Sequence, residues 1–102
     1  MLNNYTYTVT TADTDYELCS AAKGKELTVL SIMINGGEEG GDVTISIGDY
    51  QMAFTIAKED TIVLDHKIVV TNGFPMKVKA SAEGIKLSVS VAELDADSTT
   101  AN

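Results

Sequence analysis

The sequence predicts a single all-β domain, an antiparallel, jelly-roll-like β-sandwich of about eight strands. Apolar residues recur at every second position over most of the chain, which is typical of strands with one buried face. No window repeats apolar residues at helical spacing. Turn-forming residues interrupt the alternation at intervals of roughly 8–12 residues, and this spacing favours a sandwich or a small barrel.

Alternating segments predict strands from the N-terminus onward. The last of them, residues 85–91, is the most regular, because apolar residues alternate with Lys or Ser throughout. β-branched residues are frequent in these segments and disfavour helix further. Together with residues 26–35, the predicted strands lie at residues 5–9, 42–48, 50–57, 62–64, 68–70, 76–80 and 85–91.

The turn at Gly48 and Asp49 joins two alternating segments and predicts a tight hairpin. In the second of these segments, Tyr50 and Phe54 share a face with two other apolar residues, so both rings are expected in the core. The glycine-rich run at residues 36–41 predicts a flexible loop between strands.

Residues 26–35 differ from the other strands because they are apolar at both alternating positions. A strand that is apolar on both faces is covered on both. It is therefore either the central strand of the domain beneath a second layer, or the strand that meets a neighbouring subunit. Its two faces carry Leu30, Ile32 and Ile34 on one side and Leu27, Val29 and Met33 on the other.

Self-association is expected through the second of these faces. Leaving Leu27, Val29 and Met33 in water would forgo roughly 1.5–3 kcal/mol for each side chain. They are therefore expected to be covered by a loop, by the N-terminal strand that carries Tyr5 and Tyr7, or by another subunit. Tyr5 and Tyr7 are also candidate contact residues, since amphipathic aromatic side chains suit interfaces.

The length of 102 residues fits one domain and is too short for two independent cores. Residues 1–94 are expected to form this domain, because every alternating segment lies there. Residues 95–102 contain no large apolar side chain and are expected to form a flexible acidic and polar tail. A single cysteine, Cys19, excludes an intrachain disulfide, so stability must come from packing or assembly.

The charge balance restricts the partners. Fifteen acidic residues against seven lysines, with no arginine, give a formal charge of −8. Such a chain repels a phosphate backbone, so no nucleic-acid binding is expected. No segment approaches the roughly 20 apolar residues of a membrane helix, and no membrane partner is expected. The N-terminus lacks the features of a secretory signal, which predicts synthesis and retention in a cytoplasm.

His66 and Cys19 are the residues whose chemistry most resembles that of catalytic groups. His66 is the only histidine, and Asp65 beside it would point to the opposite side of a strand. Cys19 has no basic neighbour in its segment that would favour a thiolate. We therefore expect a polar histidine at a bend, a buried inert thiol and no catalytic residue.

Carboxylates form three short clusters, but none has the spacing of a calcium-binding loop. Glu38 and Glu39, on the glycine-rich loop, are most simply a solvated tip. No metal or other cofactor is therefore expected. The three clusters are Asp13 with Asp15, Glu38 and Glu39 with Asp42, and Asp95 with Asp97.

Several short motifs follow one another from residue 15 to residue 94, about four-fifths of the chain. A tyrosine-containing strand and a Gly-Lys turn precede a long strand that ends in Asn, a hairpin, a Lys-Ile-Val step, a Gly turn, a Lys-Val-Lys-Ala-Ser-Ala segment and a Ser/Val strand. They lie at residues 15–18, 23–25, 27–35, 43–56, 64–70, 72–73, 77–82 and 87–91. In this order they resemble small β-sandwich proteins and domains of tailed-bacteriophage particles.

The resemblance implies a virion accessory protein, such as a capsid decoration (cement) protein or a small head, neck or tail component. It implies no catalytic residue. The expected partners are other virion proteins and further copies of the chain, and a trimer would suit particle sites of threefold symmetry. The alternative is a carbohydrate- or receptor-binding adhesion module. The chain departs from the usual pattern at residues 72–75, which replace a Gly-Asp turn, and in the acidic loop at residues 36–41.

Overall fold

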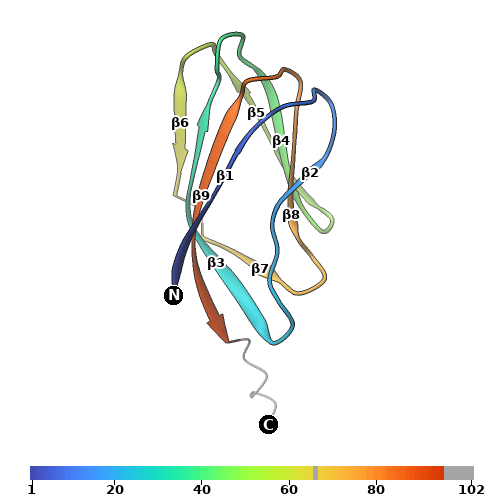
Figure 1. The fold of residues 1–102 in the computed structure, drawn as a ribbon, viewed down its shortest axis with the longest axis vertical. Coiled ribbons are helices and arrows are strands. Elements are labelled where there is room, and N and C mark those ends of the chain that lie inside the picture. Colours follow the sequence, from blue (N-terminus) through green and yellow to red (C-terminus); the bar gives the residue numbers. More distant parts are fainter. Residues whose placement is uncertain (66, 96–102) are drawn as a thin grey trace.

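The structure, a computed structural model, describes residues 1–65 and 67–95, and in these it contains nine strands and no helix. The strands form two antiparallel sheets packed face to face, as Figure 1 shows. This confirms the all-β sandwich. Sheet A is ordered β1 (Leu2–Thr8), β9 (Lys86–Asp95), β3 (Lys25–Asn35) and β6 (Thr61–Leu64), with β7 (Ile68–Thr71) also paired to β3. Sheet B is ordered β2 (Tyr16–Cys19), β8 (Met76–Ala80), β4 (Gly41–Ile47) and β5 (Tyr50–Ile56).

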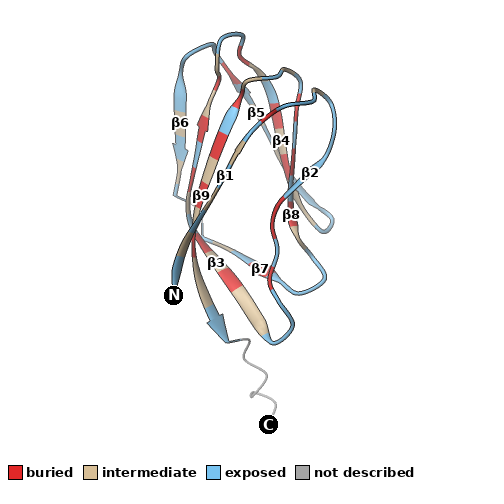
Figure 2. Ribbon diagram, viewed as in Figure 1, coloured by how far each residue is buried: buried red, intermediate tan, exposed pale blue. Residues whose placement is uncertain are grey.

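The core lies between the two sheets and is almost entirely aliphatic. Buried residues alternate with exposed or half-buried ones along the strands, most regularly in β8 and in β9 as far as Val91 (Figure 2). Among the described residues no polar or charged side chain is buried, so burial of apolar area supplies the main stabilising free energy. No helix in this part of the chain has the length and hydropathy needed to cross a membrane.

β3 contains one extra residue relative to its partner β9. Val29 pairs with Val91 and Ser31 pairs with Ser90, so Leu30 has no partner on β9. This is a β-bulge, which shifts the alternation of side chains by one position. Leu27 and Val29 before the bulge, and Ile32 and Ile34 after it, therefore all face the core.

The assignment of Leu27, Val29 and Met33 to one face is therefore wrong. The exposed fractions of Leu27 and Val29 are 1% and 0%, because both pack inside the sandwich. Met33 points outward and is 47% exposed. The second apolar face of residues 26–35 arises because the bulge brings side chains from both alternating positions to a single core.

The bulge also coincides with a change of neighbour on the other edge of β3. Residues before it pair with β7, from Glu26 to Val29, and residues after it pair with β6, from Ile32 to Asn35. β3 is therefore an inner strand of sheet A, which agrees with the first part of one predicted alternative. The second part is wrong, because sheet B covers only its core side, and Leu30 and Met33 on the other side are exposed.

One side of the sandwich is closed by two tyrosines. Tyr7 of β1, at the end of sheet A, stacks on Tyr16 of β2, at the end of sheet B. Their ring centroids are 3.6 Å apart and the ring planes differ by 2°. β2 is a short strand that the alternation did not indicate, because only its last two residues, Leu18 and Cys19, are buried.

The predicted hairpin and glycine-rich loop are both present, with one difference. Ile47 pairs with Tyr50 across a two-residue turn in which Gly48 has a φ of 58°, a conformation that favours glycine. The glycine-rich loop, however, is tightly held. A β-carbon at Gly36 would lie 2.1 Å from the carbonyl oxygen of Ala57, so close backbone packing requires this glycine.

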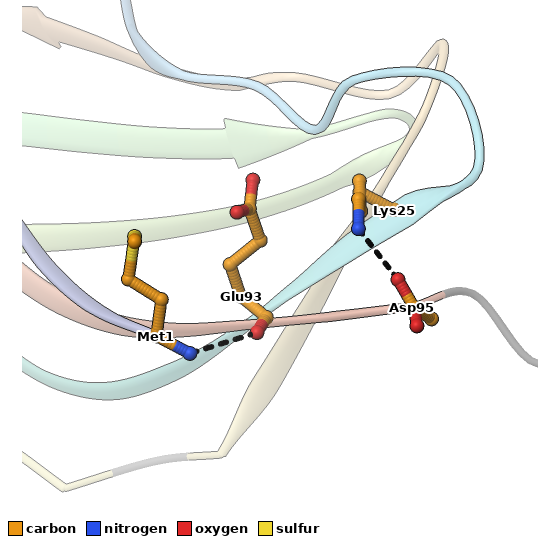
Figure 3. Close-up of polar contacts among 4 residues, drawn as sticks. All are labelled: Met1, Lys25, Glu93 and Asp95. Carbon is orange, nitrogen blue, oxygen red and sulfur yellow. Dashed lines mark hydrogen bonds and ion pairs between the residues drawn. The ribbon is translucent and has the colours of Figure 1, made fainter.

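Polar contacts join the end of β9 to the start of β3 and to the N-terminus. The Nζ atom of Lys25 lies 2.5 Å from the Oδ1 atom of Asp95, and the N-terminal amine donates to the Glu93 carbonyl over 3.3 Å (Figure 3). Lys25 and Asp95 are exposed enough for solvent to weaken their ion pair. Asp95, assigned from the sequence to the tail, is thus the last residue of β9, and residues 96–102 lie outside the described part.

Deleting Leu30 tests the bulge. The deletion would leave Leu27, Val29, Ile32 and Ile34 in a regular alternation, so we expect a folded protein with a small decrease in melting temperature. Deleting Ser90, directly opposite on β9, is the matched control. It would turn buried valine side chains outward, which forgoes roughly 1.5–3 kcal/mol for each one. Thermal unfolding followed by circular dichroism measures both, and equal losses of stability would contradict the bulge.

Candidate binding surface

The outer face of sheet A is formed by the side chains that alternate with the core residues. Cross-strand pairing places them in rows, one of which runs from Thr6 through Ser88 and Met33 to Val63. The face comprises Leu2, Asn4, Thr6 and Thr8 from β1, Lys86, Ser88, Ser90, Ala92 and Leu94 from β9, Glu26, Thr28, Leu30, Ser31, Met33 and Asn35 from β3, Thr61 and Val63 from β6, and Val69 and Thr71 from β7.

This face differs from the chain as a whole in its chemistry. Within the five strands its charged residues are Glu26 and Lys86, although the chain carries 15 acidic residues. It holds six of the ten exposed large apolar residues, so apolar surface is concentrated there. Depletion of charge with clustered apolar side chains is typical of the centre of a protein–protein interface. The six are Leu2, Leu30, Met33, Val63, Val69 and Leu94.

Small polar side chains fill the space between the apolar ones, and hydrogen bonds hold several of them in place. The Asn35 amide donates to the Thr61 hydroxyl over 3.0 Å, and the Ser90 hydroxyl donates to the Asn4 side-chain oxygen over 2.7 Å. Ser and Thr lose little side-chain entropy when a partner immobilises them. The face therefore offers ordered donors and acceptors as well as apolar contact.

Two shallow hollows lie on this face. The larger, about 490 Å³, is lined by Met33, Asn35 and Thr61 together with residues of β1 and β9. The smaller, about 340 Å³, lies where Leu30 projects beside Leu2. Both are open, and their outward-pointing lining combines hydroxyl or amide groups with aliphatic carbon.

The candidate contact residues divide into three groups. Met33 lies at the centre of the outer face of sheet A. Tyr5 and Tyr7 are half-buried and pack against the core from the inner side of β1, so they do not belong to that face. Leu27 and Val29 lie inside the sandwich. Sequence reasoning missed the polar members of the face, although the small uncharged residues that alternate through β1 and β9 carry the signal.

The two aromatic rings of β5, expected in the core, differ in burial. Tyr50 is 83% exposed, so its predicted place in the core is wrong, whereas Phe54 packs partly against the core as predicted. Tyr50 is the first residue of β5, next to the turn at the end of the sheet, and lies outside the core cluster.

Cys19 is buried, as predicted, with 4% of its surface exposed. Burial, together with the negative charge of Glu17, raises the pKa of the Cys19 thiol from its ordinary value of 9.0 to about 11. A thiol with this pKa is protonated at neutral pH and is a poor nucleophile. His66 lies outside the described residues.

The acidic clusters do not assemble as the sequence groups them. Glu38 and Glu39 line a hollow of about 480 Å³ at one end of the sandwich with Glu59 and Glu83. Asp42 instead accepts a hydrogen bond from the Thr55 hydroxyl over 2.8 Å. Within residues 1–65 and 67–95, no three acidic, histidine or cysteine side chains are placed to hold a metal ion. Asp97 lies outside this part.

The raised pKa of Cys19 predicts alkaline destabilisation. Between pH 9 and about 11 the unfolded chain loses the thiol proton first, so the free energy of unfolding falls as pH rises. Once the pH exceeds both pKa values, the total decrease in the free energy of unfolding is about 2.7 kcal/mol. Urea titrations at several pH values measure it. A Cys19→Ala variant should lack this component of the pH dependence, and pH profiles identical to the wild type would contradict the assignment.

No family model and no curated protein matches the chain. Among solved structures, it is similar to the carbohydrate-binding module CBM6cm-2 from Cellvibrio mixtus lichenase 5A, determined in complex with cellotriose. The sequence identity is 17% and the TM-score is 0.38, over 88% of this chain and 67% of the other. At these values the likeness carries no inference about what this chain binds.

Proposed function

We propose that this protein is a non-enzymatic structural protein of a bacteriophage particle, and that it attaches to coat subunits through the outer face of sheet A. The observation that carries the proposal is the chemistry of that face. A chain of net charge −8 presents there a broad, ordered surface with little charge and most of its exposed aliphatic residues. Such a surface can be covered by another protein without burying unpaired carboxylates.

The phage particle as the location is proposed from the motif order between residues 15 and 94. A decoration or head–tail accessory protein needs a rigid domain with one adhesive face, and the outer face of sheet A is the surface proposed for this role. Its acidic residues lie mainly in turns and at the ends of strands, where they favour solubility before assembly. Neither nucleic acid nor a membrane is a proposed partner.

A non-catalytic role agrees with the state of the thiol. Cys19 is buried and protonated at neutral pH, so it is unsuited to nucleophilic catalysis. We therefore propose that the protein acts by binding alone.

A second candidate function, carbohydrate binding, is favoured by one observation. The larger hollow presents the side chains of Thr6, Thr8, Asn35, Thr61 and Ser88, which are suitable donors and acceptors for sugar hydroxyls. Sugar-binding sites usually add an aromatic ring for stacking. Tyr7 contributes to the lining, but its ring is stacked on Tyr16 between the sheets.

Replacing Met33 and Val63 by lysine tests the proposed surface. The two residues pair directly across β3 and β6 and point outward, so the double variant should fold normally. Two charges at the centre of the interface should weaken binding to coat particles by roughly tenfold or more. Cosedimentation with particles assembled from the coat protein of the proposed phage measures the loss.

Ser46→Lys, on the outer face of sheet B, is the control and should bind normally. Equal binding by the control and the double variant would contradict the proposed surface. Failure of the wild-type protein to cosediment, combined with saturable binding to a soluble oligosaccharide in calorimetry, would favour the second candidate.

A further inference from the structure

The sandwich has exposed edge strands that differ in how well they are protected against pairing. β2, β6 and β7 are four residues long, and β2 also carries a register shift and the charge of Glu17. β1 is also seven residues long and uncharged, but its open edge lies beside β2 of the other sheet, where Tyr7 stacks on Tyr16. β5 has seven residues, no charged side chain, no proline and a regular register with β4. Natural edge strands usually carry one of these protective features.

The register of β5 shows which of its backbone N–H and C=O groups form no hydrogen bond with β4. Ile47 and Tyr50 flank a two-residue turn, and the pair that flanks such a turn exchanges its backbone hydrogen bonds. Hydrogen-bonded pairs recur at every second position along an antiparallel ladder. The N–H and C=O groups of Gln51, Ala53 and Thr55 therefore point away from β4, toward the open edge of sheet B.

We propose that β5 pairs antiparallel with β5 of a second copy of the chain, about a twofold axis at Ala53. In this register Gln51 lies opposite Thr55 of the partner, and Ala53 lies opposite itself. The outward backbone groups of both strands then meet as hydrogen-bonded pairs. The two copies of sheet B become one continuous sheet.

The side chains of β5 are complementary to themselves in this register. On the outer side, the small Ala53 meets its own copy between two pairs of uncharged polar residues. On the inner side, Met52 lies opposite Phe54 of the partner, and both are only half-buried in one chain. Cross-strand pairs of this kind stabilise a sheet. A two-fold contact requires such self-complementarity.

An apolar slot beside β5 gives the partner strand a place to bury side chains. It has a volume of about 300 Å³ and is lined mainly by aliphatic residues of β4, β5 and β7, with Tyr50 and Met52 at the open edge. The proposed register brings Phe54 and Ile56 of the partner next to Met52 and Tyr50. Strand addition commonly combines backbone pairing with a pocket for a side chain.

The distribution of charge favours a second copy as the occupant. Each chain carries a net charge of −8, so a contact between two copies must avoid facing carboxylates. β5 has no charged side chain, and the first charges beyond its ends are Asp49 and Lys58. The register places Asp49 opposite Ala57 of the partner, one residue from Lys58. The nearest charges across the contact therefore have opposite signs. The next acidic residue, Glu59, belongs to the loop after β5, where its backbone N–H donates to the carbonyl oxygen of Gly37.

A proline at position 53 tests this contact. Because the Ala53 N–H points to the open edge, Ala53→Pro removes no hydrogen bond to β4 and is tolerated at an edge strand. Sedimentation velocity should show wild-type protein at twice the 10.8 kDa chain mass at about 100 µM, a concentration suited to weak dimers. Ala53→Pro should sediment as a monomer, and the control Ala53→Ser as a dimer. A monomeric wild type, or a dimeric folded proline variant, would overturn the proposal.

Cysteine cross-linking tests the register even if the proline variant fails to fold. Opposite Cα atoms of a hydrogen-bonded pair lie about 5.5 Å apart, within disulfide range. In a Cys19→Ala background, Ala53→Cys should form a covalent dimer on mild oxidation, and so should the double variant Gln51→Cys/Thr55→Cys. Gln51→Cys alone should not. The absence of cross-linking in the first two, or efficient cross-linking of Gln51→Cys alone, would overturn the register.

The β5 contact is independent of the proposed attachment through sheet A. The Met33 and Val63 double variant should remain dimeric, and Ala53→Pro should retain the outer face of sheet A. A variant that loses coat binding but stays dimeric would therefore identify the outer face of sheet A as the attachment surface. A variant that becomes monomeric but still binds the coat would identify β5 as the dimer contact.

Discussion

The unpaired residue Leu30 in β3 determines which side chains of the longest strand face the core. A regular strand would bury either Leu27 and Val29 or Ile32 and Ile34, and would leave the other pair in water. The bulge buries all four, with exposed fractions of 0 or 1%. β3 thus contributes to one continuous core while it pairs with β9 along nearly its whole length, and its other edge is shared between β7 and β6.

The outer face of sheet A also follows from this shift. Because the core aliphatic residues of β3 are directed inward on both sides of the bulge, its outward positions are occupied by Glu26, by small polar residues, and by Leu30 and Met33. The matching positions on β1 and β9 are largely Asn, Thr and Ser. The surface therefore combines aliphatic and small polar side chains without being strongly apolar, as the proposed attachment face requires.

Much of the fold could be predicted from the sequence, because each strand with one buried face carries its own period-two pattern. The bulge left a signal that was misinterpreted: Leu27 and Val29 are out of phase with Ile32 and Ile34, and two-sided burial explains that pattern equally well. No glycine or other typical residue marks position 30. The order of strands in each sheet, the tyrosine stack and the close packing at Gly36 depend on tertiary contacts, which a single sequence does not specify. The polar residues on the outer face of sheet A were missed because each is an ordinary surface residue in the sequence, and only the strand register places them side by side.

Thiol accessibility along β3 tests whether the strand changes phase at Leu30. Single cysteines would be placed at each position from residue 27 to residue 34 in a Cys19→Ala background, and their rates of modification in the folded protein compared with those in urea. We expect protection at residues 27, 29, 32 and 34 and rapid modification at the adjacent pair Leu30 and Ser31. Strict alternation of fast and slow positions through the whole segment would contradict it.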